Sequence, residues 1–376
     1  MTIYVDVSSA VHAKAGLKRY AENLVRELEQ PLGGRLHLFQ NSLGRRGPLA
    51  GWEEHPTVGV RHGYKMWRAL VLARQVVHWP MDDLLPDASL FHATEHLLPP
   101  LRRIPTVLTV HDLIFERYPK YHKIKNYLYL QAAMPLYCRR ATAIIAVSES
   151  TREDIIDLYH IPPKKITVIP EAADPNFCPQ PAETIEAVRS RYDLPPRYLL
   201  AVGTIEPRKN LSRLADASGP LFDQDLVDAL VLVGSKGWLY EDFFRHLETL
   251  PWQDRILLTG FVEEEDLPAV YAGALLMVQP SLYEGFGLPV LEAMACGCPV
   301  CASNTSSLPE VGGEAARYFD PRDTEGIIHC IGHVLRHPHL HQEMVAKGLA
   351  RAKAYSWKRT ARQTLNLYQR LIDGSI

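Results

Sequence analysis

The sequence has 376 residues, of which 47% are hydrophobic and 22% are charged. This composition excludes a wholly disordered chain, and at about 100–200 residues per domain the length predicts two to three domains. The 41 basic and 43 acidic residues give a net charge of −2, which argues against a dedicated nucleic-acid-binding protein. Residues 1–170 carry 22 Lys and Arg against 16 Asp and Glu, a net of +6, whereas residues 171–376 carry 19 against 27, a net of −8. This asymmetry indicates two units with different partners.

The cysteine content and the apolar runs indicate the cellular compartment in which the protein works. Six cysteines in a chain of this length are too few for a disulfide scaffold, so we expect a reducing environment. The first residues, MTIYVDVSS, show no basic stretch followed by an apolar one, so we expect no signal peptide. No run approaches the roughly 18 apolar residues of a membrane-spanning helix. We therefore expect a cytoplasmic protein that is at most peripheral on the inner face of the membrane.

Short apolar runs alternate with helical patterns in the first half of the chain. Thr2–Val7 predicts a strand, and Ser150 with Glu153 predicts a capping box at the start of a helix. The segment after the first strand places six apolar residues on one helical face: Leu17, Tyr20, Ala21, Leu24, Val25 and Leu28. Further strands are expected at Leu36–Phe39, Leu90–Ala93, Thr106–His111, Ala143–Ser148 and Ile166–Ile169.

The second half repeats the alternation after Pro170–Pro181, a segment with four prolines that we interpret as a linker. Strands are expected at Tyr198–Val202, Ala229–Val233, Arg255–Thr259, Leu275–Gln279, Val300–Ser303 and Arg317–Phe319. Strand–helix alternation with apolar strands predicts parallel sheets covered by helices on both faces. The expected fold class is α/β, with two doubly wound domains facing each other across a cleft and ligands beyond the carboxyl ends of the strands.

The segment Ser281–Cys296, SLYEGFGLPVLEAMAC, follows an apolar strand and is the richest candidate for a binding site. Gly285 and Gly287 free the backbone to approach a ligand, and the start of the helix that follows attracts an anion such as phosphate. Glu284 and Glu292 flank this loop and can accept hydrogen bonds from the hydroxyls of one ligand. A sugar nucleotide offers both a diphosphate and hydroxyl-rich rings; an ordinary helix start with exposed acids is the alternative.

The octet 203–210, GTIEPRKN, also follows a strand and begins a helical pattern. Arg208 and Lys209 would project two cations at the mouth of the same cleft, where they can neutralise charge on a leaving diphosphate. A solvated helix start is the alternative for this octet in isolation. Because basic residues in a first turn oppose the helix dipole, a compensating anion is expected.

Two places in the first half are weaker candidates. Residues 13–20, AKAGLKRY, lie between the first strand and its helix, where a doubly wound domain presents a ligand loop. His111 ends another strand and can hydrogen-bond a sugar hydroxyl or act as an acid or base. A structural role is the alternative for a single histidine.

Three patterns suggest metal ligands, and we discount each of them. The cysteines at 296, 298 and 301 have no second pair at zinc spacing, and the five histidines between 329 and 341 have no acid that would orient them. The D-x-D at 223–225 precedes a strand instead of following one. We therefore expect no metal and no cofactor, because lysine, arginine and helix amides can carry the phosphate charge.

These segments resemble the motifs of the retaining glycosyltransferases of family 4, the glycosyl transferases group 1, which have the GT-B fold. EGFGLPVLE at 284–292 resembles the family's E-x7-E motif, and GTIEPRKN at 203–210 resembles its phosphate-site motif. Other family segments occur in the same order, and the resemblance covers nearly the whole chain: GLKRY at 16–20, VHDLIFERYP at 110–119, VSESTREDI at 147–155, VIPEAADPNF at 168–177 and YSWKRTARQTLNLYQRLI at the C-terminus.

The resemblance implies two Rossmann-like domains. Residues 1–170, with the C-terminal helix 357–376 crossing back to them, would bind the acceptor, and residues 182–356 would bind the nucleotide sugar. In the family's pattern Glu284 would bind the hydroxyls of the transferred sugar. Arg208 and Lys209 would stabilise the departing diphosphate, and His111 would face the sugar near the reaction centre.

The remaining binding residues are also implied by the resemblance. The amides of Gly285, Phe286, Gly287 and Leu288 would hold the diphosphate, and Glu292 would take the ribose hydroxyls. Three further positions would complete the site: Gly16 in a closing loop, Gly203 in the phosphate-site motif, and Val262 next to the base. The chain departs from the family pattern at Thr204, where many members have an arginine, and at Lys18, where a small residue is common.

The implied function is metal-independent, retaining transfer of a hexose from a nucleotide-diphosphate sugar to a glycan or lipid-linked acceptor in polysaccharide biosynthesis. The mechanism would be front-face transfer, and we expect Lys209→Ala and Glu284→Ala to fold normally but to lose activity. UDP-glucose-type donors are slightly favoured over GDP-mannose-type donors. A non-catalytic sugar-nucleotide-binding or regulatory protein on the same fold is the alternative. An NAD-dependent oxidoreductase would need a G-x-G-x-x-G after a strand, which the chain lacks in that context.

Basic and apolar residues are mixed in residues 63–74 and 118–140. A basic amphipathic helix can lie on an anionic membrane, so these segments suggest peripheral membrane contact. A helix packed on the core with a basic rim is the alternative for each segment.

Overall fold

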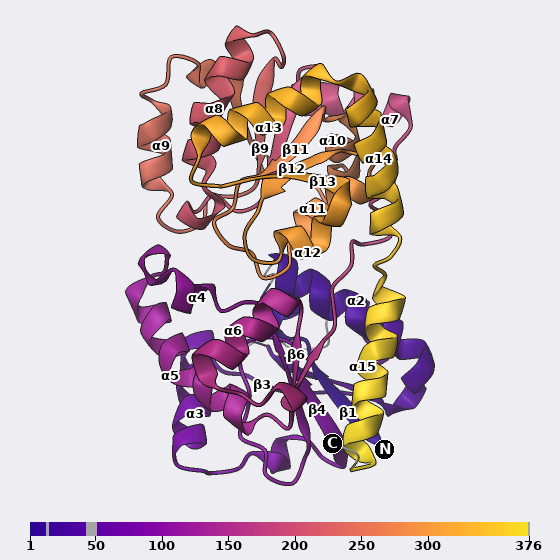
Figure 1. Ribbon diagram of the computed structural model, residues 1–376. Coiled ribbons are helices and arrows are strands. Elements are labelled where there is room, and N and C mark those ends of the chain that lie inside the picture. Colours follow the sequence, from indigo (N-terminus) through magenta and orange to yellow (C-terminus); the bar gives the residue numbers. More distant parts are fainter. Residues whose placement is uncertain (13–14, 43–50, 375–376) are drawn as a thin grey trace. The chain divides into compact units, whose positions relative to one another are not determined.

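The computed structural model describes residues 1–12, 15–42 and 51–374 (Figure 1). The chain forms two compact units. Unit 1 comprises Met1–Leu113, Lys125–Glu171 and Ser356–Ile376, and unit 2 comprises Ile114–Ile124 and Ala172–Tyr355. The segment 114–124 therefore belongs to unit 2, although the sequence analysis assigned it to the first domain.

Unit 1 is built on a seven-stranded sheet in the order β3-β2-β1-β4-β5-β6-β7, and all of its pairings are parallel. The strands are β1 (Thr2–Asp6), β2 (Leu36–Asn41), β3 (Thr57–Val60), β4 (Ala88–Ala93), β5 (Thr106–Val110), β6 (Ala143–Ala146) and β7 (Ile166–Val168). The expected strands are present with ends shifted by at most two residues. The strand β3 was not predicted, because it is a short and partly exposed edge strand with a glycine in its centre.

The helices of unit 1 pack their apolar faces against this sheet. They are α1 (Ser8–Val11), α2 (Ala15–Leu32), α3 (Tyr64–Val76), α5 (Ile124–Arg140), α6 (Glu149–Tyr159) and α15 (Trp357–Ile372), with 3-10 turns η1 (Gly33–Arg35), η2 (Asp82–Leu84) and η4 (Pro163–Lys165). In α2, the predicted apolar face is buried from Tyr20 to Leu28. The helix α6 begins two residues earlier than predicted, because Ser148 and not Ser150 is its N-cap and accepts a hydrogen bond from the Thr151 amide.

The C-terminal helix α15 is part of unit 1 and packs against α2 and β4. Its Trp357 ring meets the Tyr20 ring edge-on, with centroids 5.7 Å apart. Inside the core, His92 Nδ1 lies 2.6 Å from the Tyr368 hydroxyl, and His92 Nε2 lies 2.7 Å from Thr109 Oγ1. This buried polar chain joins α15 to the two central strands β4 and β5.

Unit 2 has a six-stranded sheet in the order β10-β9-β8-β11-β12-β13, again with parallel pairings. The strands are β8 (Tyr198–Val202), β9 (Ala229–Val233), β10 (Ile256–Gly260), β11 (Leu276–Gln279), β12 (Val300–Ser303) and β13 (Ala316–Phe319). This is the strand order of a doubly wound nucleotide-binding sheet, and it reverses between β8 and β11. Every strand expected in this half is present.

The helices of unit 2 cover both faces of its sheet (Figure 1). They are α4 (Ile114–Arg117), α7 (Ala182–Arg191), α8 (Leu211–Asp223), α9 (Glu241–Leu247), α10 (Leu267–Gly273), α11 (Leu288–Ala295), α12 (Leu308–Gly312), α13 (Thr324–Arg336) and α14 (Pro338–Ala352), with 3-10 turns η3 (Pro119–Tyr121), η5 (Pro207–Lys209), η6 (Gln253–Arg255) and η7 (Gly313–Ala315). One core cluster packs α8 and α13 on the sheet through apolar residues such as Leu214, Leu230 and Ile331.

The segment 114–124 is held in unit 2 by contacts of its aromatic residues and its backbone. The Tyr118 hydroxyl donates to the Leu282 carbonyl at 3.2 Å, and the Trp238 indole donates to the Tyr121 carbonyl at 2.5 Å. The Tyr118 ring also lies 6.2 Å from the Tyr283 ring. These contacts join residues more than 100 positions apart in the chain, which is why local patterns assigned the segment to the first half.

Candidate active site

The two motifs of the second half meet at the point where the strand order of unit 2 reverses. The octet 203–210 follows β8, and the loop 280–287 follows β11, the strand paired with β8. The carboxyl ends of adjacent parallel strands lie at the same edge of the sheet, and ligands of doubly wound sheets bind there. The Leu282 amide donates to the Arg208 carbonyl at 2.9 Å, so the two loops are also tied together by their backbones.

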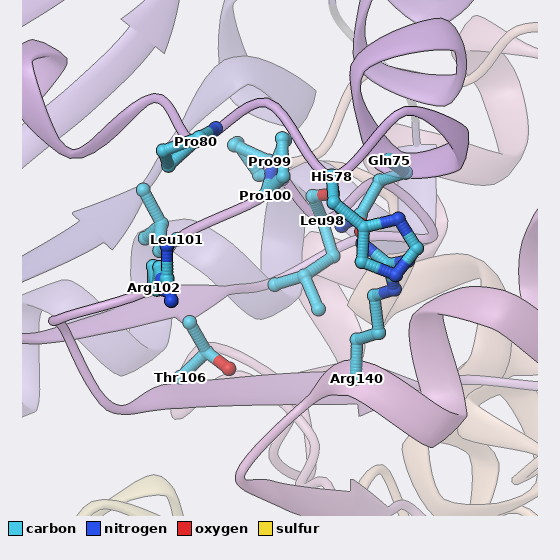
Figure 2. A pocket seen from close by; sticks show the side chains of 10 residues that line it. All are labelled: Gln75, His78, Pro80, Leu98, Pro99, Pro100, Leu101, Arg102, Thr106 and Arg140. Carbon is cyan, nitrogen blue, oxygen red and sulfur yellow. Dashed lines mark hydrogen bonds between the residues drawn. The ribbon is translucent and has the colours of Figure 1, made fainter.

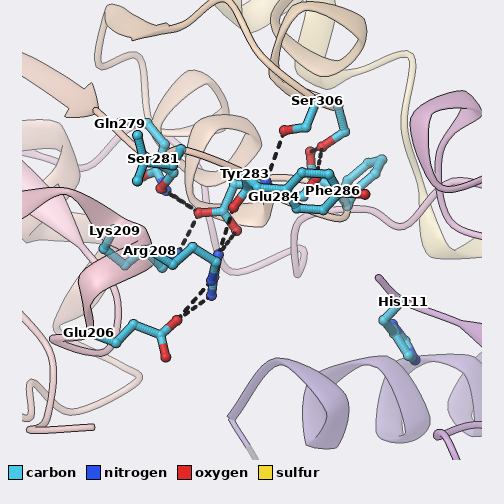
Figure 3. A network of polar contacts seen from close by, with 12 residues as sticks. His111, Glu206, Arg208, Lys209, Gln279, Ser281, Tyr283, Glu284, Phe286 and Ser306 are labelled. Atoms are coloured by element: carbon cyan, nitrogen blue, oxygen red, sulfur yellow. Dashed lines mark hydrogen bonds and ion pairs between the residues drawn. The ribbon is translucent and has the colours of Figure 1, made fainter. Parts of the chain in front are cut away.

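Glu284 is the centre of a dense polar network at this edge (Figure 3). Its Oε1 accepts hydrogen bonds from Lys209 Nζ at 2.6 Å, Ser281 Oγ at 2.6 Å and Gln279 Nε2 at 2.8 Å. Its Oε2 accepts a hydrogen bond from Arg208 Nη1 at 2.5 Å. The structure thus brings together Arg208, Lys209 and Glu284, three of the charged residues predicted for this site, and the anion expected beside the cations is Glu284.

Burial makes the charges of this network depend on one another. Burial by itself would raise the pKa of Glu284, but the charges of Arg208 and Lys209 outweigh it and lower the pKa to about 2. Burial lowers the pKa of Lys209, and the Glu284 carboxylate opposes that effect. Glu284 therefore stays ionised at neutral pH and can accept hydrogen bonds from ligand hydroxyls.

Glu206 is a member of the network that the sequence analysis did not single out. Its Oε1 accepts a hydrogen bond from Arg208 Nε at 2.9 Å and forms an ion pair with Arg208 Nη2 at 2.5 Å. The guanidinium is therefore held between Glu206 and Glu284. Burial raises the pKa of Glu206 in spite of the neighbouring Arg208 and Lys209. The signal in the sequence was its place inside GTIEPRKN, but only the fold shows that it pairs with the arginine two residues later.

Two glycines are required by the geometry of these loops. Gly203 has φ +145°, and a β-carbon there would lie 3.1 Å from Lys209 Cε and 3.2 Å from Lys209 Nζ. Gly287 has φ +108° and is the N-cap of α11, and a β-carbon there would lie 2.9 Å from Leu308. Both positions favour glycine because of the backbone angle and because of the close neighbour.

The loop 285–288 leads directly into α11, with Phe286 buried and Gly285 and Leu288 half-buried. Ser307 Oγ lies 3.0 Å from the Glu284 carbonyl oxygen and 2.6 Å from the Phe286 carbonyl oxygen. Ser306 Oγ accepts a hydrogen bond from the Glu284 backbone amide at 2.8 Å. The two serines thus orient the peptide groups that precede the helix N-terminus, a role that no motif in the sequence indicated.

Glu292 lies within α11 and is buried, and its Oε2 accepts a hydrogen bond from the Tyr271 hydroxyl at 2.8 Å. The sequence analysis did not identify Tyr271, which is on α10. Val262, the residue predicted near the base, is buried just after β10, whereas the adjacent Phe261 is 67% exposed. Gly260 at the end of this strand has φ +70°, which turns the chain towards these two residues.

His111 lies in unit 1, directly after β5, and both of its ring nitrogens face acceptors. Nδ1 lies 2.8 Å from Glu171 Oε1, and Nε2 lies 2.8 Å from the Thr94 carbonyl oxygen. Burial opposes the charged imidazolium, but the hydrogen bond and charge of Glu171 outweigh burial and raise the pKa of His111. In this arrangement both ring nitrogens of His111 are bonded within unit 1, and its contact with the transferred sugar stays a prediction.

Gly16 is placed differently from the prediction. It is the second residue of α2, so residues 16–20 are helical and do not form a closing loop. Residues 13 and 14 of the predicted loop lie outside the described residues. Leu17 and Tyr20 belong to the helical face that the apolar period predicted, and the helix extends back over the residues of the predicted loop.

Within residues 1–12, 15–42 and 51–374, no group of three or more His, Cys, Asp or Glu side chains is placed to hold a metal ion. The rings of His329 and His333 stack on the exposed side of α13, and the ring of His337, the C-cap of this helix, lies tilted against His333. The thiols of Cys301 and Cys330 approach to 3.3 Å. The chemistry of the network around Glu284 does not depend on these groups.

Two parallel doubly wound units, one of which has a carboxylate and two cations at its switch point, are the arrangement expected of the GT-B fold. Two family models match the chain: "Glycosyl transferases group 1" over residues 184–351 and "Glycosyltransferase Family 4" over residues 15–177. The O-antigen chain mannosyltransferase B of Escherichia coli is 36% identical over 310 residues, which cover 80% of each chain. The protein belongs to glycosyltransferase family 4, group 1, as the sequence motifs predicted.

Further similarities agree with this family. The serotype-specific mannosyltransferase WbdA of Escherichia coli is 32% identical over 72% of this chain and 34% of its own length, so it is much longer. HepE from Anabaena in complex with UDP and glucose has a TM-score of 0.74 at 18% identity, with 98% of this chain and 99% of that one covered. Sucrose-phosphate synthase from Thermosynechococcus elongatus has a TM-score of 0.78 at 21% identity over both complete chains. The predicted GT-B fold is confirmed, and family membership excludes the dehydrogenase.

Proposed function

We propose that the protein is a retaining hexosyltransferase that moves mannose from a nucleotide-diphosphate sugar to a glycan or lipid-linked acceptor in polysaccharide biosynthesis. The observation that carries the proposal is the Glu284 carboxylate, which binds both Arg208 and Lys209 at the switch point of the unit 2 sheet. A diphosphate needs the cations and a sugar ring needs the carboxylate, and this edge of the sheet presents both.

The sugar is inferred from two relatives, which are named as mannosyltransferases. The sequence motifs were compatible with UDP-glucose-type and GDP-mannose-type donors and slightly favoured the former. The names of these relatives support mannose, so we propose a GDP-mannose-type donor.

Each charged group has a role in this proposal. Lys209 and Arg208 bind the diphosphate and stabilise the charge that grows on it as the glycosidic bond breaks. The amides of residues 285–288 and the N-terminus of α11 add positive potential at the same oxygens. Glu284 accepts hydrogen bonds from the hydroxyls of the transferred sugar, and Glu292 accepts hydrogen bonds from the ribose hydroxyls. The base lies near Val262.

The transfer follows a front-face route, in which the acceptor oxygen forms its bond to the anomeric carbon on the face from which the diphosphate leaves. The acceptor proton passes to the departing phosphate oxygen, so the configuration is retained and no protein nucleophile is needed. The protein contributes orientation and electrostatic stabilisation of an oxocarbenium-like state. No metal is required, since two side-chain cations and backbone amides carry the phosphate charge.

The proposal predicts the activity of two variants. Lys209→Ala and Glu284→Gln should each lower kcat for mannosyl transfer by about 10²–10³-fold, the range found when one preorganised group that stabilises developing charge is removed. Transfer and slow hydrolysis of GDP-mannose are measured with purified protein, with and without EDTA. Lys347→Ala, an exposed lysine of α14, is the matched control and should keep full activity.

Three results would contradict this assignment. Wild-type turnover in Lys209→Ala would show that Lys209 does not stabilise the departing diphosphate. An enzyme that binds GDP-mannose but neither hydrolyses nor transfers it would establish the non-catalytic alternative. Loss of activity in EDTA, restored by a divalent cation, would overturn metal independence.

A further inference from the structure

The helix α3 has two apolar faces, and only one of them is used inside unit 1. Trp67, Val71 and Gln75 are buried against the sheet, as expected for a surface helix. On the opposite side of the helix, Met66 is 57% exposed and Val76 is 61% exposed, with Ala69 and Ala73 exposed between them. These four residues follow the 3.6-residue period, so they form one stripe along the outer face of the helix.

The stripe continues past the end of α3. Val77 is 64% exposed and Trp79 is 63% exposed, and the Arg74 guanidinium carbon lies 5.0 Å from the centroid of the Trp79 ring. Single exposed apolar residues are ordinary on protein surfaces, whereas a contiguous run with an aromatic end marks an interaction site. We call Met66, Ala69, Ala73, Val76, Val77 and Trp79 the α3 stripe.

The segment that carries the α3 stripe is positively charged, although Asp82 and the exposed Asp83 follow it directly. Residues 61–81 contain Arg61, Lys65, Arg68 and Arg74 and no aspartate or glutamate. The helix α5 is fastened to α3 by a hydrogen bond from Arg68 to Asn126 at 2.9 Å, and α5 also contains basic residues but no acid. The helices α3 and α5 lie side by side (Figure 1), and both contain apolar and cationic residues.

A cavity of about 330 Å³ opens at the C-terminal end of α3 (Figure 2). His78, Arg102 and Arg140 line it together with buried residues of the loop 98–100, and none of its lining residues is a carboxylate. Arg140 donates to Gln75 Oε1 at 3.0 Å, and its Nη2 lies 2.7 Å from His78 Nε2. Asp82 lies nearby, but its carboxylate accepts hydrogen bonds from the backbone amides of Arg102 and Arg103. The chemistry of this cavity suits a phosphate-bearing head group.

We propose that the α3 stripe and this cavity dock unit 1 onto an anionic phospholipid bilayer. The stripe would enter the interfacial region, with Trp79 at head-group level, and the flanking cations would meet the anionic lipids. A second copy of the chain is disfavoured as the occupant, because its own α3 surface has the same positive sign. In the described part of the chain no helix is both long and apolar enough to cross a membrane, so the proposed contact lies along the surface.

The test is co-sedimentation of the full chain with vesicles of phosphatidylcholine alone and of phosphatidylcholine mixed with phosphatidylglycerol. The wild type should sediment with the mixed vesicles only. Val77→Ser with Trp79→Ser should weaken binding at least about tenfold, and Lys65→Gln or Arg74→Gln about fivefold each. Leu258→Ser, an exposed residue of β10, and Lys358→Gln, an exposed residue of α15, are matched controls that should bind as the wild type does.

The other outcomes overturn the proposal. Equal sedimentation with both vesicle types, or none with either, would remove the anionic bilayer as the partner. Displacement by inorganic phosphate but not by sodium chloride of equal ionic strength would assign the cavity to free phosphate. A dimer in sedimentation velocity that Val77→Ser with Trp79→Ser dissociates would assign the stripe to a second copy. Vesicle binding is measured without donor, so its failure is distinguishable from failure of the proposed transferase function.

Discussion

Glu284 balances two cations that are buried beside it, and this balance is a matter of stability as well as catalysis. Both Lys209 and Glu284 are less than a tenth exposed. Removing one partner of a buried ion pair leaves the other charge without compensation, which costs about 3–5 kcal/mol. The expectation that variants at these positions fold normally therefore changes once their burial is known.

The two partners should differ in their effect on stability. Lys209→Ala leaves Glu284 with Arg208, Ser281 and Gln279, whereas Glu284→Ala removes the anion from both cations. We expect Glu284→Ala to lower the free energy of unfolding by about 3–5 kcal/mol and Lys209→Ala to lower it by less. Urea denaturation measures both, and equal losses in the two variants would contradict the role of Glu284 as the shared anion.

A second residue-scale prediction concerns His92. Burial, with the nearby charge of His111, lowers the pKa of His92 to about 3, against an ordinary value of 6.5. The unfolded chain therefore binds a proton that the folded chain does not, so His92 contributes stability above pH 6.5 that is lost as pH falls from 6.5 towards 3. In His92→Gln, the decline in unfolding free energy over this range should be shallower. An identical pH dependence in both proteins would exclude His92 as its source.

At the scale of elements, the strands were predictable because each is a short, continuous apolar run, as expected for strands covered on both faces. Helix starts were less predictable, since they depend on which of several serines forms the cap. Ser148 and Ser356 both accept the amide three residues later, from Thr151 and Arg359 respectively. Ser148 is fully buried and also donates to Thr151 Oγ1 at 3.1 Å.

These caps predict the cost of two substitutions. Loss of a serine cap costs about 0.5–2 kcal/mol, so Ser356→Ala should lower unfolding free energy by about 1 kcal/mol. Ser148→Ala should reach about 2 kcal/mol, because it also leaves the buried Thr151 hydroxyl without this partner. Ser150→Ala, two residues after the true cap, is the control and should change stability little. A larger loss for Ser150→Ala than for Ser148→Ala would contradict the assigned helix start.

At the scale of the whole molecule, the chain divides into two units, each with its own parallel sheet and core. The basic excess of residues 1–170 includes the α3 surface, and the acidic excess of residues 171–376 includes the proposed donor site. The net charge of the second half does not oppose diphosphate binding, because Arg208, Lys209 and the α11 N-terminus set the local potential.

Two units with separate cores predict two thermal transitions. A nucleotide that binds only folded unit 2 stabilises that unit by about 2.7 kcal/mol at one hundred times its dissociation constant. In calorimetry, GDP should therefore raise one transition and leave the other unchanged, and UDP and ADP should have smaller effects. A larger shift with UDP would favour the UDP-sugar donor over the proposed one.

The sequence alone determined the α/β class, the strands with the exception of β3, the family, and the candidates Arg208, Lys209, Glu284 and Glu292. These follow from local information, namely periodicity and motif spacing, which do not depend on distant parts of the chain. Only the tertiary structure decided that Glu206 and Glu284 hold Arg208 between them, that Glu171 and Thr94 occupy both nitrogens of His111, and that α3 exposes an apolar stripe. Each of these depends on which residues the topology brings within about 3 Å or leaves uncovered, and side chains as far apart as positions 209 and 284 have no local pattern that records their contact.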